Sequence, residues 1–332
     1  MNTLHVTNGD AVGGSLMKAG LGDAVLPWRD VLHDGPVPGG LDAAALRIVR
    51  ATFLASRGWS TFDTALADFA GRDAQLGATG AGDTVVLWFE PDLYDQLQLL
   101  QILTRFYLRP LRDRPTITIV ASDQLLGPLA IDTLAKYGDT QRAVREVDLE
   151  LAASGWEAFT SSDTEMLRAF AGHETALFSA PNYASDSAVV LPHVHAAMRR
   201  LLEEYPSTTN GVSRTEQQTL SALLSGPRSV AKLYEAAHAP NETMAWLGDW
   251  SFAWYVEQMM LAGTPLIACA DGSDMIAGLT QSDSDRFWKQ PVQLTAAGRE
   301  VATDQANAIL LNGIDRWIGG VHLLSPLRDT IN

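Results

Sequence analysis

Cysteine is almost absent from this sequence, in which Cys269 is the only one among 332 residues. A single cysteine cannot form an intrachain disulfide, and it excludes a zinc site built from several cysteines. Cys269 stands in an apolar stretch, so we expect a buried and unreactive thiol. Because disulfides are rare in reducing compartments, the sequence predicts a cytoplasmic protein.

Long apolar runs are also missing. Nowhere do about 18 uncharged apolar residues follow one another, and a helix needs roughly that length to cross a bilayer. The opening residues, MNTLHVTNGDAVGG, have neither the cationic start nor the apolar core of a signal peptide. We therefore expect a protein that is neither exported nor inserted in a membrane.

Positive charge is scarce, since the formal net charge is −15 and acidic residues outnumber basic ones in both halves of the chain. Between Lys232 and Arg286 there is no lysine or arginine at all. Affinity for nucleic acids comes largely from these cations on phosphates. The charge pattern therefore disfavours nucleic acid as a partner and a DNA-binding transcription regulator as the function.

The common nucleotide and hydrolase motifs do not occur. Residues 9–14, Gly-Asp-Ala-Val-Gly-Gly, do not fit G-x-G-x-x-G, and neither the P-loop pattern nor G-x-S-x-G is present. A glycine-rich turn that opens a helix still presents backbone N–H groups to a phosphate. Asp10 would oppose such an anion unless a metal ion lay between them.

The first half of the chain alternates short apolar runs with helical periods. This alternation predicts a parallel sheet with right-handed crossovers, and thus a Rossmann-like three-layer α/β domain over residues 1–205. The expected strands are 4–7, 24–26, 84–89 and 116–120, and the expected helices include 41–56, 62–69 and 93–106.

The second half, residues 206–332, follows a linker-like stretch at 205–211. Ser213 and Glu216 have the spacing of a capping box, which predicts a helix start. Three helical stretches and two strands then resemble a winged helix, so we expect a winged-helix-like α+β domain. The helices are expected at 214–224, 229–238 and 243–262, and the strands at 265–270 and 292–295.

Trp246, Trp250 and Trp254 repeat every four residues in the third of these helices. This spacing predicts one aromatic face, which is typical of a core or of a contact surface. We interpret it as a surface for a protein partner or for a second copy of the chain.

Polar residues gather where three of the predicted strands end. Because ligands bind beyond the carboxyl ends of parallel strands, we expect one carboxylate-rich crevice for a small polar ligand. The three groups are His5, Thr7, Asn8, Gly9 and Asp10; Trp28, Arg29, Asp30 and His33; and Glu90, Asp92, Asp95 and Gln96.

Each group also has a structural explanation. Asp10 is a good N-cap residue, Arg29 and Asp30 could form an ion pair, and Asp92 and Asp95 suit the first turn of a helix. Three such groups at corresponding points of the topology nevertheless favour a functional crevice. Several carboxylates in one cleft can bind a divalent cation or raise one another's pKa.

The leading hypothesis is an enzyme, a metal-assisted hydrolase or transferase acting on a small polar or phosphorylated molecule. Arg29 would hold an anionic group, and His33 would act as acid or base. Asp10, Asp30, Asp92 and Asp95 would shuttle protons or bind a cation such as Mg²⁺. Further ligand contacts are expected from His5, Thr7, Asn8, Gly9, Trp28, Glu90, Gln96 and, in the terminal segment, Arg316.

The alternative, from a different class, is a non-catalytic adaptor or regulatory protein. In that case the crevice senses a small ligand, and the tryptophan-rich helix presents the partner surface.

Three segments carry a resemblance to a known family: LHVTNGDAVGGSL, LPWRDVLHDGPVP and VVLWFEPDLYDQLQLLQ. They resemble the uncharacterised bacterial family catalogued as domain of unknown function 1835, over roughly the first 120 residues. EEYPSTTNGVSRTE and NGIDRWIGGVHL resemble the C-terminal region that accompanies this domain. The resemblance implies that Asp10, Asp30, Asp95 and Gln96 are shared positions, and it implies no particular reaction.

Overall fold

The structure is a computed structural model that describes residues 2–21, 24–120, 122–172, 191–274 and 284–325. The chain divides into two compact units. The first unit comprises residues 1–52, 62–201 and 319–321, and the second comprises 53–61, 202–318 and 322–332. The sequence placed the boundary at 205 and gave no sign of the two short exchanged segments. Among the described residues, no helix is long and apolar enough to span a membrane.

The first unit is built on a five-stranded sheet in the order β2-β1-β4-β5-β6. All neighbours in this sheet are parallel except β6, which runs antiparallel at one edge. The predicted α/β class is therefore confirmed. The elements are β1 (Thr3–Thr7), α1 (Asp10–Lys18), β2 (Ala24–Pro27), β3 (Gly35–Pro36), α2 (Ala43–Ser56), α3 (Phe62–Gly77), β4 (Thr84–Trp88), α4 (Leu93–Tyr107), η1 (Leu111–Asp113), β5 (Thr116–Val120), α5 (Ile131–Tyr137), η2 (Gly138–Thr140), β6 (Gln141–Ala143), α6 (Glu146–Thr160), α7 (Thr164–Gly172) and α9 (Val194–Leu202).

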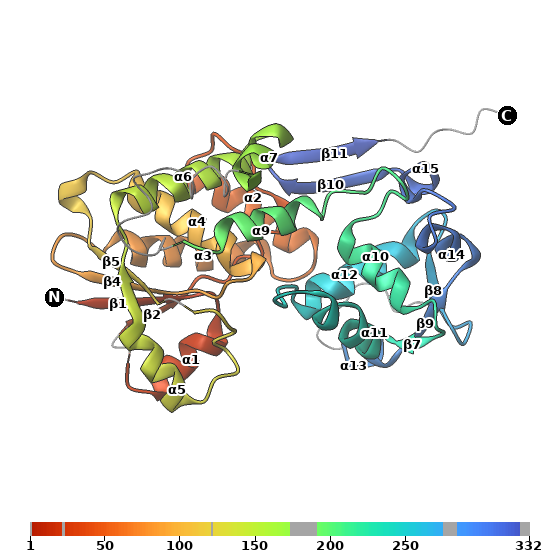
Figure 1. Ribbon diagram of the computed structural model, residues 1–332, viewed down its shortest axis with the longest axis horizontal. Helices are drawn as coiled ribbons and strands as arrows, with labels where there is room; N and C mark the ends of the chain where they lie inside the picture. The colour runs from red at the N-terminus through yellow and green to blue at the C-terminus, as the bar shows by residue number, and fades with distance from the viewer. Residues whose placement is uncertain (1, 22–23, 121, 173–190, 275–283, 326–332) are drawn as a thin grey trace. The chain divides into compact units, whose positions relative to one another are not determined.

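Helices cover both faces of this sheet, with α1 and α5 on one face and α4 and α6 on the other (Figure 1). On the α1 side, Val12 and Leu16 pack with Val86, Trp88 and Val120 in one buried cluster. A strand covered on both sides has no solvent-facing positions, which explains why β4 reads as an uninterrupted apolar run.

The order of the strands creates a switch point between β1 and β4. From β1 the chain passes through α1 to β2 on one side, and it later returns to place β4 on the other side of β1. Because the two connections leave in opposite directions, the carboxyl ends of β1 and β4 are the place where ligands bind in open α/β sheets. The Asn8-Gly9-Asp10 turn and the Glu90–Asp95 segment follow these two strand ends.

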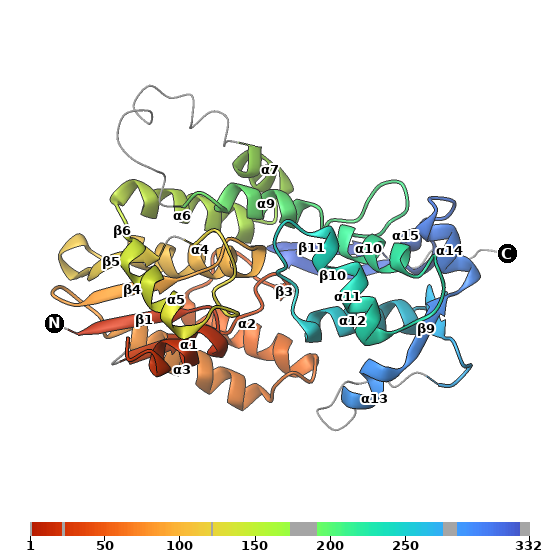
Figure 2. The ribbon, with the colours of Figure 1, turned by 60° about the horizontal axis from the view of Figure 1, so that its bottom comes forward.

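The second unit combines helices with a small antiparallel sheet in the order β7-β9-β8. Helices α10, α11 and α12 lie together (Figure 2). The elements are α10 (Arg214–Ala222), β7 (Arg228–Ser229), α11 (Val230–Ala237), η3 (Ala239–Asn241), α12 (Asp249–Leu261), β8 (Ile267–Cys269), α13 (Ser284–Lys289), β9 (Pro291–Leu294), α14 (Ala296–Ala302), α15 (Ala308–Asn312), β10 (Ile314–Gly319) and β11 (Val321–Ser325).

The prediction of three tryptophans on one helical face was wrong. Helix α12 begins at Asp249, so Trp246 precedes it; the Trp246 side chain is buried, and its backbone N–H donates to Nε2 of His238 at 3.1 Å. Trp254 is half-buried, and the Arg57 guanidinium lies 3.5 Å from the centre of its ring. The spacing misled because the helix starts later than the sequence pattern indicated.

Residues 319–321 belong to the first unit because two glycines let the chain lie directly on the end of α6. Gly319 has φ +58°, and Gly320 donates its N–H to the carbonyl of Phe159 at 3.0 Å. A Cβ atom on Gly320 would lie 1.8 Å from the carbonyl oxygen of Thr160. A side chain therefore cannot be accommodated at position 320 without moving the backbone.

Replacing Gly320 by alanine should destabilise the protein by more than about 2 kcal/mol, because the new methyl group overlaps backbone atoms rather than a flexible side chain. Urea unfolding followed by circular dichroism measures the loss. Gly14→Ala is the matched control, since a Cβ there meets nothing within 4 Å. Equal stabilities of the two variants would contradict the close approach.

Candidate functional site

The loop that follows β2 is held by a buried ion pair. Asp30 Oδ1 accepts from Nη2 and Nε of Arg50 at 2.8 and 3.1 Å, and both side chains are about fully buried, with 1% exposed. Arg50 also donates to the carbonyls of Asp34 at 2.6 Å and Val31 at 3.0 Å. One guanidinium from α2 thus fixes the course of the whole loop.

His33 lies in the same buried loop, with Nε2 3.5 Å from a carboxylate oxygen of Asp34. Burial lowers the pKa of His33 and so favours the neutral ring. The catalytic roles that the sequence suggested for Asp30 and His33 require contact with a ligand. Both residues are buried, with 0% of Asp30 and 5% of His33 exposed, so the structure shows them as part of the loop and their catalytic roles stay a prediction.

Arg29 points the other way and forms an exposed cluster. Its Nε and Nη2 donate to the two carboxylate oxygens of Asp10 at 2.9 and 2.6 Å, and Nη1 lies 3.3 Å from Asp68 of α3. The exposed side-chain fractions are 44% for Arg29, 70% for Asp10 and 59% for Asp68. The hydrogen bonds with Asp10 are the main cause of a raised pKa at Arg29.

Two structural explanations from the sequence are corrected here. Arg29 pairs with Asp10 and not with Asp30. Asp10 is the first residue of α1 and not its cap, because the N-cap is Gly9, which offers no side-chain hydrogen bond. A Cβ on Gly9 would meet nothing within 4 Å, so the space beside the start of α1 is open.

The backbone of Arg29 is strained. Its φ is +49°, in the left-handed region that residues with a side chain rarely adopt. Such a conformation costs on the order of 1–3 kcal/mol and persists where the surroundings impose it, frequently at functional sites.

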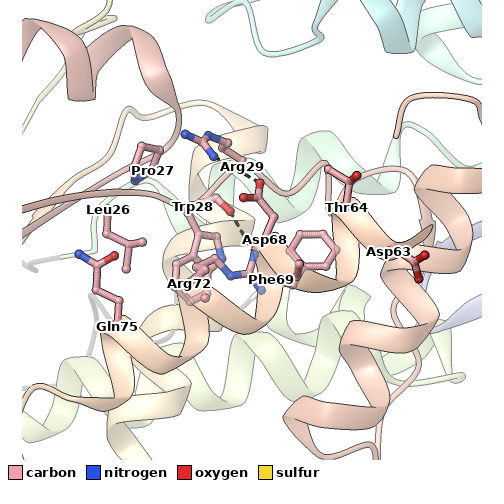
Figure 3. A pocket seen from close by; sticks show the side chains of 12 residues that line it. Leu26, Pro27, Trp28, Arg29, Asp63, Thr64, Asp68, Phe69, Arg72 and Gln75 are labelled. Atoms are coloured by element: carbon pink, nitrogen blue, oxygen red, sulfur yellow. Dashed lines mark hydrogen bonds and ion pairs between the residues drawn. The ribbon is translucent and has the colours of Figure 1, made fainter. Parts of the chain in front are cut away.

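A groove of about 730 Å³ lies beside this cluster, between the end of β2 and helix α3. Figure 3 shows Arg29 and Asp68 at its middle, Leu26 and Gln75 toward one end, and Asp63 and Thr64 toward the other. The groove therefore opens at the carboxyl end of a parallel strand. Its lining residues are Leu26, Pro27, Trp28, Arg29, Asp63, Thr64, Ala67, Asp68, Phe69, Gly71, Arg72 and Gln75.

A third cluster lies at the switch point, where Asp95 connects two strand ends. Asn8 donates to Asp95 Oδ1 at 2.8 Å, and the backbone N–H of Glu90 donates to Asp95 Oδ2 at 2.5 Å. Asp92 caps α4 by accepting from the N–H of Asp95 at 3.0 Å. Asp95 is fully buried, with 0% exposed.

Three carboxylates of this cluster share a small volume, since one oxygen each from Glu90, Asp92 and Asp95 lies within 4.8 Å of the others. Burial raises the pKa of Asp92 to about 7, with the Glu90 charge adding to it. Burial likewise raises the pKa of Glu90, and it raises that of Asp95 well above the usual range. At neutral pH the cluster therefore holds a proton, or it is the place among these residues for a divalent cation.

The remaining predicted contacts are mostly buried in internal hydrogen bonds. His5 accepts from Trp88, Thr7 donates to the Gly9 carbonyl, Trp28 donates to Gln101, and Gln96 donates to the Glu90 carbonyl. Arg316 belongs to the second unit, where it pairs with Glu216. The predicted residues of the first unit that keep partial exposure are Asn8, Gly9, Asp10 and Arg29.

Sequence reasoning missed Arg50, Asp68 and the rest of the α3 wall. Arg50 did carry a signal: Leu46, Arg50 and Phe53 are spaced four and three apart, so the arginine sits on the apolar face of its helix. Asp68 carried none, because an acidic residue on an exposed helix face is ordinary.

No family model and no curated protein matches this chain. The resemblance noted in the sequence therefore stays a prediction.

Replacing Asp30 by asparagine should cost about 3–5 kcal/mol of stability, because it leaves the buried Arg50 without its charge partner. The free energy of unfolding in urea measures the effect. Asp10→Asn makes the same chemical change in an exposed pair, where a loss within about 1 kcal/mol is expected. Similar losses in the two variants would show that the Asp30 pair is not buried as described.

Asp92 should make the folded state less stable as pH rises. Its folded pKa, about 7, lies above the value of about 3.9 for an unfolded aspartate. The folded state therefore retains a proton that the unfolded state loses, and this stabilisation is present below about pH 4 and lost as pH rises to about 7.

Asparagine resembles the protonated acid, so Asp92→Asn should gain stability relative to the parent between pH 4 and 7, and the difference should level off above pH 7. Urea titrations with a chelator present measure this difference. Asp113→Asn, at an exposed site, should show a constant difference. A constant difference for Asp92→Asn as well would contradict the raised pKa.

Proposed function

We propose that the first unit is a metal-assisted hydrolase or transferase acting on a small phosphorylated molecule in the groove beside Arg29. The observation that carries the proposal is Arg29 itself, which is exposed, strained at φ +49° and placed at the edge of a groove of about 730 Å³. A guanidinium binds phosphate oxygens through two parallel hydrogen bonds.

The start of α1 supports the same placement. Gly9 is the N-cap without a side-chain hydrogen bond, and the space beside it is open. Backbone N–H groups at a helix N-terminus attract anions. A phosphate on Arg29 would therefore also lie near the positive end of a helix dipole.

The carboxylates around Arg29 explain why a cation is part of the proposal. Asp63 and Asp68 are exposed in the lining of the groove, and the exposed Asp10 pairs with Arg29 beside it, so three carboxylates face the single exposed guanidinium of Arg29. A bare phosphate would be repelled by this local excess of negative charge, whereas its Mg²⁺ complex would not. Asp10, released from Arg29 by the phosphate, would contact the ion or take a proton from the attacking water or hydroxyl.

The cluster of Glu90, Asp92 and Asp95 is a second place for Mg²⁺, which prefers oxygen ligands. Its oxygens already accept backbone hydrogen bonds, including those from Leu126 at 2.5 Å and Gly127 at 3.0 Å to Glu90. A cation there would replace the shared proton and would stabilise the fold, while the ion that serves the reaction would lie with Asp10 and Arg29 beside the groove.

For the finer architecture, we propose a Rossmann-like first unit and a winged-helix-like second unit. The order α10, β7, α11, η3, α12, β8, α13, β9 supports the latter, because three main helices precede β8 and the sheet order is β7-β9-β8. Helix α12 carries Asp249 and Glu257 and no basic residue. The proposed role of this unit is therefore contact with a protein, in line with the adaptor alternative, rather than with DNA.

Replacing Arg29 by glycine tests the proposal. Glycine adopts positive φ without strain, which offsets the loss of exposed ion pairs, so the melting temperature should stay within about 3 °C of the parent or rise. The same variant should lose the thermal shift that sugar phosphates and nucleotides with Mg²⁺ give to the parent, because ligands stabilise only the state that binds them.

Arg112→Ala is the matched control, since Arg112 forms an exposed pair with Asp113 in the same unit and does not line the groove. It should retain the full thermal shift. An unchanged shift in Arg29→Gly, or no shift in the parent with any phosphorylated compound, would refute the proposed function.

A further inference from the structure

The groove extends in both directions from the Arg29 cluster. It follows α3 from Asp63 to Gln75, a distance of about 18 Å at 1.5 Å per helical residue. Asp68, which pairs with Arg29, stands near the middle of this stretch. An anionic group held by Arg29 would therefore be central, with an arm of the ligand on each side.

The end toward Gln75 combines apolar and amide groups. Leu26 and Pro27 of β2 form one wall there, and the exposed Gln75 amide stands opposite, as Figure 3 shows. A flat heterocycle would cover the apolar wall, while a glutamine amide offers one donor and one acceptor to the edge of a nucleic base.

The opposite end carries hydroxyl-binding groups. Asp63 and Thr64 lie in the first turn of α3, and both are exposed in the groove (Figure 3). A carboxylate accepts hydrogen bonds from neighbouring hydroxyls, as acidic residues do with ribose in dinucleotide sites. This end is too polar for a base and suits a sugar.

The lining between the two ends includes two aromatic side chains and one guanidinium, those of Trp28, Phe69 and Arg72. Arg72 lies 4.0 Å from the centre of the Trp28 ring and 4.6 Å from that of Phe69. Its Nε and Nη1 are held by Asp73 and by the Trp28 carbonyl. A fixed guanidinium below the centre of the groove adds to the attraction of Arg29 for a central anion.

We infer that the ligand is a nucleoside diphosphate whose outer phosphate carries a sugar, with the base near Gln75, the diphosphate at Arg29 and the sugar near Asp63. The inference rests on the proposed function, because it uses the same Arg29 site. The groove volume of about 730 Å³ lies in the range of roughly 300–1,000 Å³ that ligands of this size occupy.

The test compares whole ligands with their halves. Calorimetric titration with Mg²⁺ is run with ADP-glucose and UDP-glucose, with ADP and UDP, and with glucose 1-phosphate. At least one nucleotide sugar should bind about tenfold more tightly than its nucleoside diphosphate or the sugar phosphate, because both arms then contribute hydrogen bonds.

Two exposed substitutions assign the arms. Gln75→Ala should weaken the binding of the nucleotide sugar and of the nucleoside diphosphate by about five- to tenfold and leave the binding of glucose 1-phosphate unchanged. Asp63→Asn should weaken the binding of the nucleotide sugar by about fivefold or more and leave the binding of the nucleoside diphosphate unchanged. Because both residues are exposed, unchanged melting temperatures should accompany these effects.

The binding results distinguish a wrong ligand class from a wrong proposed function. If phosphorylated compounds bind and Arg29→Gly abolishes binding, but nucleotide sugars bind no better than their halves or neither arm variant has an effect, the ligand class is wrong and the proposed function stands. If no compound binds the parent protein, both are refuted.

Discussion

The buried pair between Asp30 and Arg50 is the interaction on which the candidate site depends. Two desolvated charges are costly, and their attraction compensates only when further hydrogen bonds complete the geometry. Arg50 supplies these bonds by donating to the Asp34 and Val31 carbonyls as well. The loop after β2 consequently has one course, and that course decides where Trp28 and Arg29 point.

The same pair accounts for the strain at Arg29. With Asp30 anchored inward and the N–H of Trp28 bonded to the Thr7 carbonyl at 2.8 Å, the residue between them must reverse the direction of the chain. A left-handed conformation achieves the reversal and turns the guanidinium toward Asp10. A glycine would do so without strain, so the presence of arginine points to a use for its side chain rather than to a requirement of the loop.

The sequence predicted well those features that follow from periodicity. The apolar run of β4 and the alternation with helices led to the α/β class. The single crevice expected from the three strand ends stays a prediction, since only Trp28 and Arg29 of the predicted residues line the groove. Local pattern did not predict burial, which separates Asp10 from Asp30 although both are aspartates at strand ends. Their difference comes from an arginine on α2, and only the helical spacing of Leu46, Arg50 and Phe53 hinted at it. Tertiary contacts also decide that residues 319–321 belong to the first unit and that α12 starts as late as Asp249.

The two acidic groups of the first unit therefore serve different ends. Glu90, Asp92 and Asp95 join β1, β4 and α4; burial raises the pKa of each carboxyl group, and backbone N–H groups donate to them. Asp10, Asp63 and Asp68 remain in contact with water, Asp63 and Asp68 in the wall of the groove and Asp10 beside it as the partner of Arg29. On the function proposed above, a ligand that enters would bring its own cation and displace Arg29 from its carboxylates. The groove would for that reason favour a phosphate that arrives as a metal complex, and the exposed ion pair would be the competitor that the ligand has to replace.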